Sequence, residues 1–124
     1  MSKSVIAVVE DIFFASKIKA TAEHLGIEVR FPRSMDEAIE NARSSNAALL
    51  VADLHCERCD PFALATALKS DERVRHLPLL GFFSHVQTAL QRRAETSGFD
   101  RVMPRSAFTK QLAEILQKAK EGEA

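Results

Sequence analysis

Five short apolar runs alternate along this chain with five segments of helical periodicity, and this alternation constrains the fold more than any other feature. Runs with few polar residues are typical of strands buried on both faces of a sheet. The segments between them carry apolar side chains at helical spacing. We predict strands at residues 5–9, 27–31, 47–52, 77–83 and 100–103, and helices at 13–25, 35–42, 61–68, 86–96 and 106–118.

Strands that alternate with helices form a parallel sheet, because the chain must cross over between parallel neighbours. The predicted fold is therefore α/β, a doubly wound five-stranded parallel sheet with helices on both faces. A length of 124 residues suits one domain, 1–124, with an ordered core at about 4–119. The residues from Lys120 to Ala124 are expected to form a polar tail.

Local signals mark several helix ends. Gly26 is a stop for the first helix, since a glycine accepts the left-handed conformation that often ends a helix. Ser34 and Glu37 have the spacing of a capping box, and Asp60 before Pro61 is a favourable helix entry. The first helix is expected to bury one apolar face, made of Phe13, Ile18, Ala22 and Leu25.

The charge balance narrows the function classes. Lys plus Arg and Asp plus Glu number 17 each, so the chain has no net field to attract a nucleic-acid backbone or an anionic membrane. No apolar stretch approaches the roughly 18 residues of a membrane span. Cys56 and Cys59 lie too close together to staple a fold, which favours a reducing, cytoplasmic location.

Charged and hydroxyl side chains follow four of the five predicted strands. Glu10 and Asp11 follow the first strand, Asp53 the third, Ser84 the fourth and Arg105 the fifth. In open parallel sheets ligands bind beyond the carboxyl ends of the strands. Three carboxylates at one such edge repel one another unless a cation lies among them, and Mg²⁺ prefers oxygen ligands. With the hydroxyl of Ser84 and the cation of Arg105 beside the ion, such a site can also bind a phosphoryl group on a carboxylate. We therefore predict a carboxylate pocket that holds Mg²⁺ and a phosphoryl group.

These residues resemble the receiver domain of two-component response regulators, and the resemblance covers nearly the whole chain. It implies a flavodoxin-like topology, with Glu10 and Asp11 as the acidic pair that holds Mg²⁺ and Asp53 as the phosphoacceptor. By the same resemblance the backbone carbonyl of His55 is a metal ligand, and Ser84 is the hydroxyl that contacts the phosphoryl group.

The chain departs from the family pattern at its switch residues. Arg105 stands where the family has a lysine, and Ser106 stands where a proline should follow. Val102 replaces the aromatic residue of the fifth strand, so the usual coupling of hydroxyl to aromatic ring cannot operate in its usual form. His85 follows Ser84 where the family favours a small residue, and it is expected to narrow the access to Asp53.

The resemblance implies a stand-alone, non-enzymatic receiver. It would accept a phosphoryl group from a histidine kinase or a phosphotransfer protein, with at most self-catalysed transfer and autodephosphorylation. Its signal would pass to a downstream protein over the fourth helix, the fifth strand and the fifth helix, and a homodimer stays open.

Two alternatives remain. The departures at Val102, Arg105 and His85 favour a pseudo-receiver, in which the same fold binds proteins without phosphorylation. The Cys-x-x-Cys motif of Cys56 and Cys59 suggests a thiol sensor or, together with His55 and His85, a zinc site.

Overall fold

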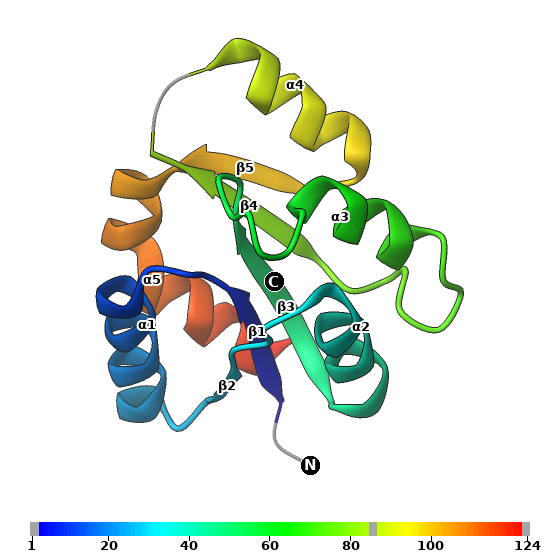
Figure 1. Ribbon diagram of the computed structural model, residues 1–124. Coiled ribbons are helices and arrows are strands. Elements are labelled where there is room, and N and C mark those ends of the chain that lie inside the picture. The colour runs from blue at the N-terminus through cyan, green and yellow to red at the C-terminus, as the bar shows by residue number, and fades with distance from the viewer. Residues whose placement is uncertain (1–2, 85–86, 123–124) are drawn as a thin grey trace.

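The computed structural model describes residues 3–84 and 87–122, which form a five-stranded parallel sheet with helices on both faces (Figure 1). The strand order is β2-β1-β3-β4-β5, which confirms the predicted doubly wound, flavodoxin-like topology. The strands are β1 (Ser4–Val8), β2 (Glu28–Arg30), β3 (Ala47–Asp53), β4 (Leu79–Phe83) and β5 (Arg101–Pro104). The helices are α1 (Ile12–Leu25), α2 (Met35–Ser44), α3 (Pro61–Lys69), α4 (Thr88–Ser97) and α5 (Arg105–Glu121).

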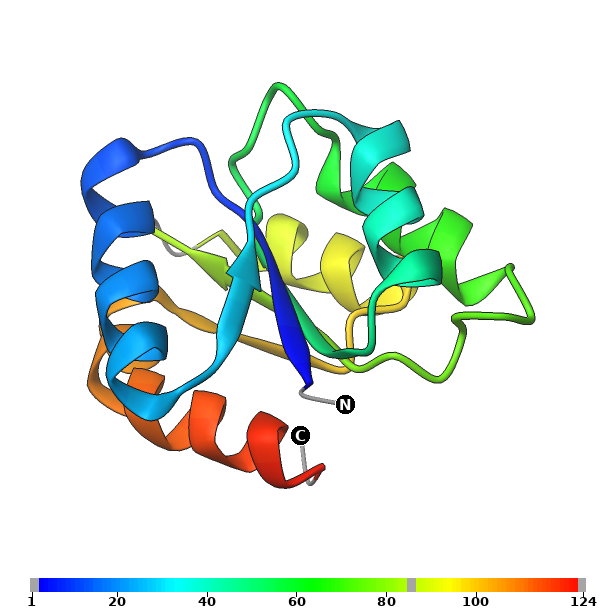
Figure 2. The ribbon, with the colours of Figure 1, turned by 90° about the horizontal axis from the view of Figure 1, so that it is seen from below.

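The helices divide between the two faces of the sheet. In Figure 2, α1 and α5 lie on one side of the strands and α2, α3 and α4 lie on the other. Each side has its own apolar cluster: Ile18, Phe82 and Leu112 belong to the cluster under α1 and α5, and Leu50 and Leu68 to the one under α2, α3 and α4. The central strands β1, β3 and β4 contribute to both clusters, because successive side chains of a strand point to opposite faces.

The helix ends confirm the local signals of the sequence. Gly26 ends α1 with a φ of 72°, in the left-handed region that a side chain disfavours. The Asp60 carboxylate accepts from the first backbone N–H groups of α3, whose first residue is Pro61. The Ser34 hydroxyl accepts from the Glu37 N–H at 3.1 Å. The Glu37 carboxylate reaches back to the N–H of Arg33 at 3.3 Å, so the reciprocal bond of the capping box lies one residue earlier than usual.

The structure corrects two helix predictions. The buried face of α1 is Phe14, Ile18 and Ala22, whereas Phe13 is 88% exposed, so the predicted face was wrong by one residue at its start. The last helix continues past residue 118 to Glu121. Lys120 donates from its ammonium nitrogen to the backbone carbonyl of Leu25 at 2.9 Å, which ties this last turn to the end of α1.

The strand register brings the predicted site residues to one edge. Val8 of β1 pairs with Ala52 of β3, and Asp53 pairs with Phe82 of β4. The residues that follow these strands therefore lie beyond the same edge of the sheet. Within residues 3–84 and 87–122, no helix has the length and apolar character needed to cross a membrane.

Candidate functional site at the carboxyl edge of the sheet

Glu10 follows β1 and is turned toward the loop between β3 and α3. Its Oε1 accepts from the thiol of Cys56 at 3.1 Å, from the N–H of Glu57 at 2.9 Å and from the N–H of Arg58. The pKa of Glu10 is lowered, first by the Arg58 N–H and then by the Cys56 thiol, because these donors stabilise the charged carboxylate. Glu10 thus fixes this loop, a contact that no sequence signal predicted.

The two carboxylate oxygens of Asp11 accept hydrogen bonds from different elements. Its Oδ1 caps α1 by accepting from the N–H groups of Phe13 at 2.9 Å and Phe14 at 3.2 Å. Its Oδ2 accepts from the guanidinium of Arg105 at 3.1 Å. The pKa of Asp11 is lowered, first by the Phe14 N–H and then by Arg105. Asp11 therefore joins the start of α1 to the start of α5.

Arg105 is the first residue of α5, and its side chain is one-third exposed. Its guanidinium carbon lies 4.0 Å from the ring centre of Phe14, so the cation stacks on an aromatic face while it bonds Asp11. The sequence predicted a cation at this edge of the sheet, and Arg105 lies there, bonded to Asp11. It gave no indication of the aromatic ring beneath it.

Asp53 ends β3 and is half-buried. Its Oδ1 accepts from the backbone N–H of His55 at 2.9 Å. Its backbone carbonyl accepts from the N–H of Cys56 at 3.0 Å, so the chain turns directly after the strand. This turn orients the Asp53 carboxylate at the edge of the sheet.

Two of the predicted switch residues, Ser84 and Val102, lie in different environments. Ser84 is exposed and directly follows β4. Val102 in β5 is half-buried against the apolar cluster under α2, α3 and α4. His85, which was predicted to narrow the pocket, lies outside the described residues.

Two large apolar side chains beside the pocket are solvent-exposed. Ile12 is 77% exposed and Phe13 is 88% exposed, and both directly follow Asp11 at the start of α1. The two side chains thus place exposed apolar surface next to Asp11. The sequence did not reveal it, because its helical pattern placed Phe13 on the buried face.

Solved structures resemble this chain along nearly its whole length. A response regulator from Hahella chejuensis matches with a TM-score of 0.85 and 15% identity, covering 99% of this chain and 98% of that one. The receiver domain of a sensor histidine kinase from Pseudomonas aeruginosa, with magnesium in its active-site cleft, matches with a TM-score of 0.80 and 15% identity, covering 97% and 98%. The phosphorylated cyanobacterial phytochrome response regulator RcpA matches with a TM-score of 0.77 and 19% identity, covering 97% and 91%.

This chain has the receiver fold. The similarity lies in structure, since neither the models of known protein families nor the curated proteins match this sequence. At these identities it is the fold that is shared. The chemistry of the pocket must therefore be argued from this chain's own residues.

The carboxylates of this receiver fold suit Mg²⁺ in chemistry, because all three offer hard oxygen ligands. In the described conformation one oxygen of Glu10 and of Asp53, and both oxygens of Asp11, already accept hydrogen bonds from the chain. Among residues 3–84 and 87–122, no three His, Cys, Asp or Glu side chains are grouped closely enough to hold a metal ion. An ion would compete with Arg105 for Asp11 and with the β3–α3 loop for Glu10.

Both cysteines of this receiver fold are free thiols. Cys59 is buried, and burial raises its pKa. Cys56 is half-buried, and its pKa is raised to about 12, first by burial and further by the neighbouring carboxylate of Glu10. Since the thiolate is the reactive form, neither thiol has the low pKa that a redox sensor needs.

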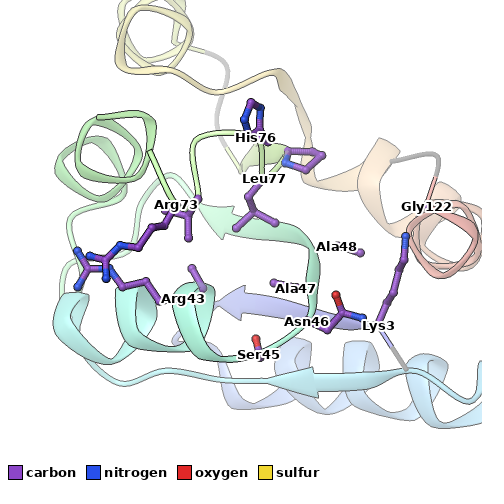
Figure 3. A pocket seen from close by; sticks show the side chains of 13 residues that line it. Lys3, Arg43, Ser45, Asn46, Ala47, Ala48, Arg73, His76, Leu77 and Gly122 are labelled. Atoms are coloured by element: carbon purple, nitrogen blue, oxygen red, sulfur yellow. The ribbon is translucent and has the colours of Figure 1, made fainter. Parts of the chain in front are cut away.

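A separate cavity of about 440 Å³ opens at the opposite edge of the sheet (Figure 3). Lys3, Arg43, Arg73 and His76 are among its lining residues, and the carboxylates at the strand ends are not. Arg43 and Arg73 both pair with Asp71, at 2.8 Å and 3.3 Å. This basic cavity is thus distinct from the predicted pocket of the receiver fold.

Proposed function

We propose that this chain is a two-component receiver that accepts a phosphoryl group on Asp53 in the cytoplasm. The observation that carries the proposal is the position of Asp53, half-buried at the carboxyl end of β3. Its neighbours in the sheet are β1, which is followed by Glu10 and Asp11, and β4, which is followed by Ser84. Two structural neighbours support it, one described with magnesium in its active-site cleft and one described as phosphorylated. The donor would be a phosphohistidine of a histidine kinase or a phosphotransfer protein.

The transfer step follows from the geometry of Asp53. The His55 N–H holds Oδ1, which orients the carboxylate and leaves Oδ2 to attack phosphorus. A bond forms between Oδ2 and phosphorus, while the bond from phosphorus to the donor's imidazole nitrogen breaks. The imidazole leaves with the electron pair and then takes up a proton. We propose no other enzymatic activity for the chain besides self-catalysed transfer and autodephosphorylation.

The remaining pocket residues would stabilise charge on the transferred group. Glu10, Asp11, Asp53 and the carbonyl of His55 are the proposed ligands for Mg²⁺, which would supply positive charge beside the phosphoryl oxygens when bound. The exposed hydroxyl of Ser84 can donate a hydrogen bond to a phosphoryl oxygen. Arg105 can contribute a charged, bidentate donor in place of a lysine.

The partners would use two surfaces. The exposed pair Ile12 and Phe13 adjoins Asp11, so a phosphodonor protein that covers the pocket would bury it. A downstream protein would bind the surface of α4, β5 and α5, where β5 contacts both helices. A homodimer over either surface is compatible with the fold.

The second candidate function is a pseudo-receiver that binds proteins without phosphorylation. The observation that favours it is the pairing of Arg105 with Asp11, which occupies an oxygen that Mg²⁺ would need. The packing of Val102 supports it as well, because no aromatic ring is present there to rotate into the core. In this case the same surfaces would act without the pocket.

Beryllofluoride, which mimics a phosphoryl group on a carboxylate, separates the two candidates. We expect beryllofluoride with Mg²⁺ to shift the amide resonances of residues 10, 11, 53, 55 and 84 in the wild-type chain. Asp53→Asn should abolish these shifts, and Asp36→Asn, an exposed carboxylate in the first turn of α2, should leave them unchanged. If wild type and Asp53→Asn respond alike, the phosphoacceptor function is wrong.

A further inference from the structure

The guanidinium of Arg105 is held from two directions. Its Nη2 lies 3.1 Å from Oδ2 of Asp11, and its central carbon lies 4.0 Å from the ring centre of Phe14. The ion pair fixes one edge of the group and the ring supports its face. A long side chain that is one-third exposed thereby loses much of its freedom.

The Phe14 ring is itself fixed, because it is only 5% exposed and packs against two other rings. It meets Phe82 of β4 edge-on, with ring centres 5.3 Å apart, and Phe108 of α5 at 5.9 Å. Phe82 and Phe108 stack on each other at 4.9 Å. Side chains of two other elements, β4 and α5, thus hold the Phe14 ring in place beside Arg105.

Phe14 also contacts Asp11 through its backbone. Its N–H donates to Oδ1 of Asp11, while its ring supports the cation that binds Oδ2. One residue therefore positions both members of the ion pair. A lysine would not use this arrangement equally well, because a planar guanidinium can stack on a ring and donate in its own plane at the same time.

We propose that Phe14 is a positioning residue that holds Arg105 on Asp11 and thereby opposes cation binding at that carboxylate. The effect of Phe14 on Mg²⁺ binding rests on the proposed function, since the proposed metal site would bind Mg²⁺ only as Arg105 leaves Asp11. The proposal accounts for the arginine at position 105. Arg105 and Phe14 act as a pair, because replacing either residue alone removes the stacking contact between them.

The first test measures the stacking directly and needs neither metal nor phosphate. In the wild-type chain the ring current of Phe14 should shift the side-chain NMR resonances of Arg105, and Phe14→Leu should remove that shift. The chain offers a matched control, because Arg93 lies over the ring of Phe62 at 4.1 Å and neither residue belongs to the pocket. Phe62→Leu should change the resonances of Arg93 and leave those of Arg105 as they were.

The second test measures Mg²⁺ affinity by titration calorimetry in a double-mutant cycle. Phe14→Leu should raise the affinity by about two- to fivefold, the equivalent of one partly exposed cation–π contact. In an Arg105→Ala background Phe14→Leu should have no further effect. Arg105→Lys keeps the charge and loses the stacking, so it should resemble Phe14→Leu and keeps the test decisive if the latter folds poorly.

Two results would overturn the inference. One is an unchanged set of Arg105 resonances in a folded Phe14→Leu chain. The other is an equal change of Mg²⁺ affinity in both backgrounds, which would mean that the ring acts through the fold and not through Arg105. If no variant binds Mg²⁺ while the ring-current result holds, the proposed metal site is wrong and the positioning role of Phe14 stands.

Discussion

Ile12, Phe13 and Phe14 are three successive apolar residues, of which the first two are exposed and the third is buried. Each residue of a helix is rotated by about 100° from the one before it, so three neighbours cannot all face the core. The cap at Asp11 sets where α1 begins, and this start turns Phe14 inward while Phe13 faces solvent. Hydropathy alone does not distinguish the two phenylalanines, since the assignment depends on where the sheet lies.

The two phenylalanines should therefore respond oppositely to truncation. Phe13→Ala should leave the free energy of unfolding almost unchanged, because the side chain is 88% exposed. Phe14→Ala should lower it by about 3–5 kcal/mol, since it removes a ring from a close-packed aromatic cluster. Urea unfolding followed by far-ultraviolet circular dichroism measures both, and similar costs for the two variants would contradict the orientation of α1.

The thiols give a second test at the scale of single residues. At pH 8 a pKa of about 12 leaves Cys56 with a roughly 1,000-fold smaller thiolate fraction than a pKa near 9 would. We expect iodoacetamide to modify both cysteines at least about tenfold more slowly in the native chain than in urea. Mass spectrometry of Cys56→Ser and Cys59→Ser separates the two sites, and a fast reaction in the native chain would support the thiol-sensor hypothesis. Stoichiometric zinc in the purified chain would support the zinc-site hypothesis.

At the scale of elements, the order and type of all ten were predictable, while several ends were not. Caps and glycines mark ends that the chain itself determines, as at Asp60 and Gly26. Gly122 ends α5 in the same way, with a φ of 82°, and the predicted end at residue 118 overlooked this glycine. The last turn of α5 is also held by the bond from Lys120 to the carbonyl of Leu25, a contact between residues 95 positions apart that helical periodicity cannot predict.

Asp71 connects two elements in a way that depends on pH. It lies after α3 and pairs with Arg43 of α2 and with Arg73. Its pKa is lowered to about 2, first by the N–H of Arg73 and then by the side chain of Arg43. A carboxyl with a depressed pKa stabilises the fold above its unfolded value of 3.8, and this contribution is lost as the pH falls toward 2.

We therefore expect Asp71→Asn to be less stable than wild type at pH 7 and the difference to shrink as the pH falls from 4 to 2. Urea titrations at several pH values measure it. Glu72→Gln, an exposed neighbour, provides the control. A difference that stayed constant down to pH 2 would show that the carboxylate contributes nothing through its charge.

At the scale of the whole molecule, the two apolar clusters lie on opposite faces of one sheet and share its central strands. Loss of packing on one face of the sheet would destabilise β1, β3 and β4, and the apolar cluster on the other face includes side chains of the same strands. The receiver fold should therefore unfold as one cooperative unit, as small single domains usually do. The proposed carboxylate site depends on both clusters, because its residues follow strands that contribute side chains to both clusters.

Leu68→Ala in α3 and Leu112→Ala in α5 test this coupling from the two faces. Each side chain is at most 2% exposed, and each truncation should lower the free energy of unfolding by about 2–5 kcal/mol. Both variants should keep a single transition, and the double variant should show roughly additive losses. Two separate transitions in either variant would contradict the shared core.

The sequence by itself determined the order of strands and helices and the edge of the sheet beyond which Glu10, Asp11, Asp53, Ser84 and Arg105 lie. Apolar periodicity and parallel crossovers are properties of the chain, and polar residues that follow parallel strands must meet at one edge. The departures from the receiver-family pattern at Val102 and Arg105 could likewise be read from the sequence alone.

Only the tertiary structure decided what those side chains contact. It turned Glu10 to the β3–α3 loop, set Arg105 between Asp11 and the ring of Phe14, and left Phe13 in solvent. These contacts join residues up to 94 positions apart. They depend on how α1, α5 and the loops pack on the sheet. A local sequence pattern does not determine the distances between residues that only this packing brings together.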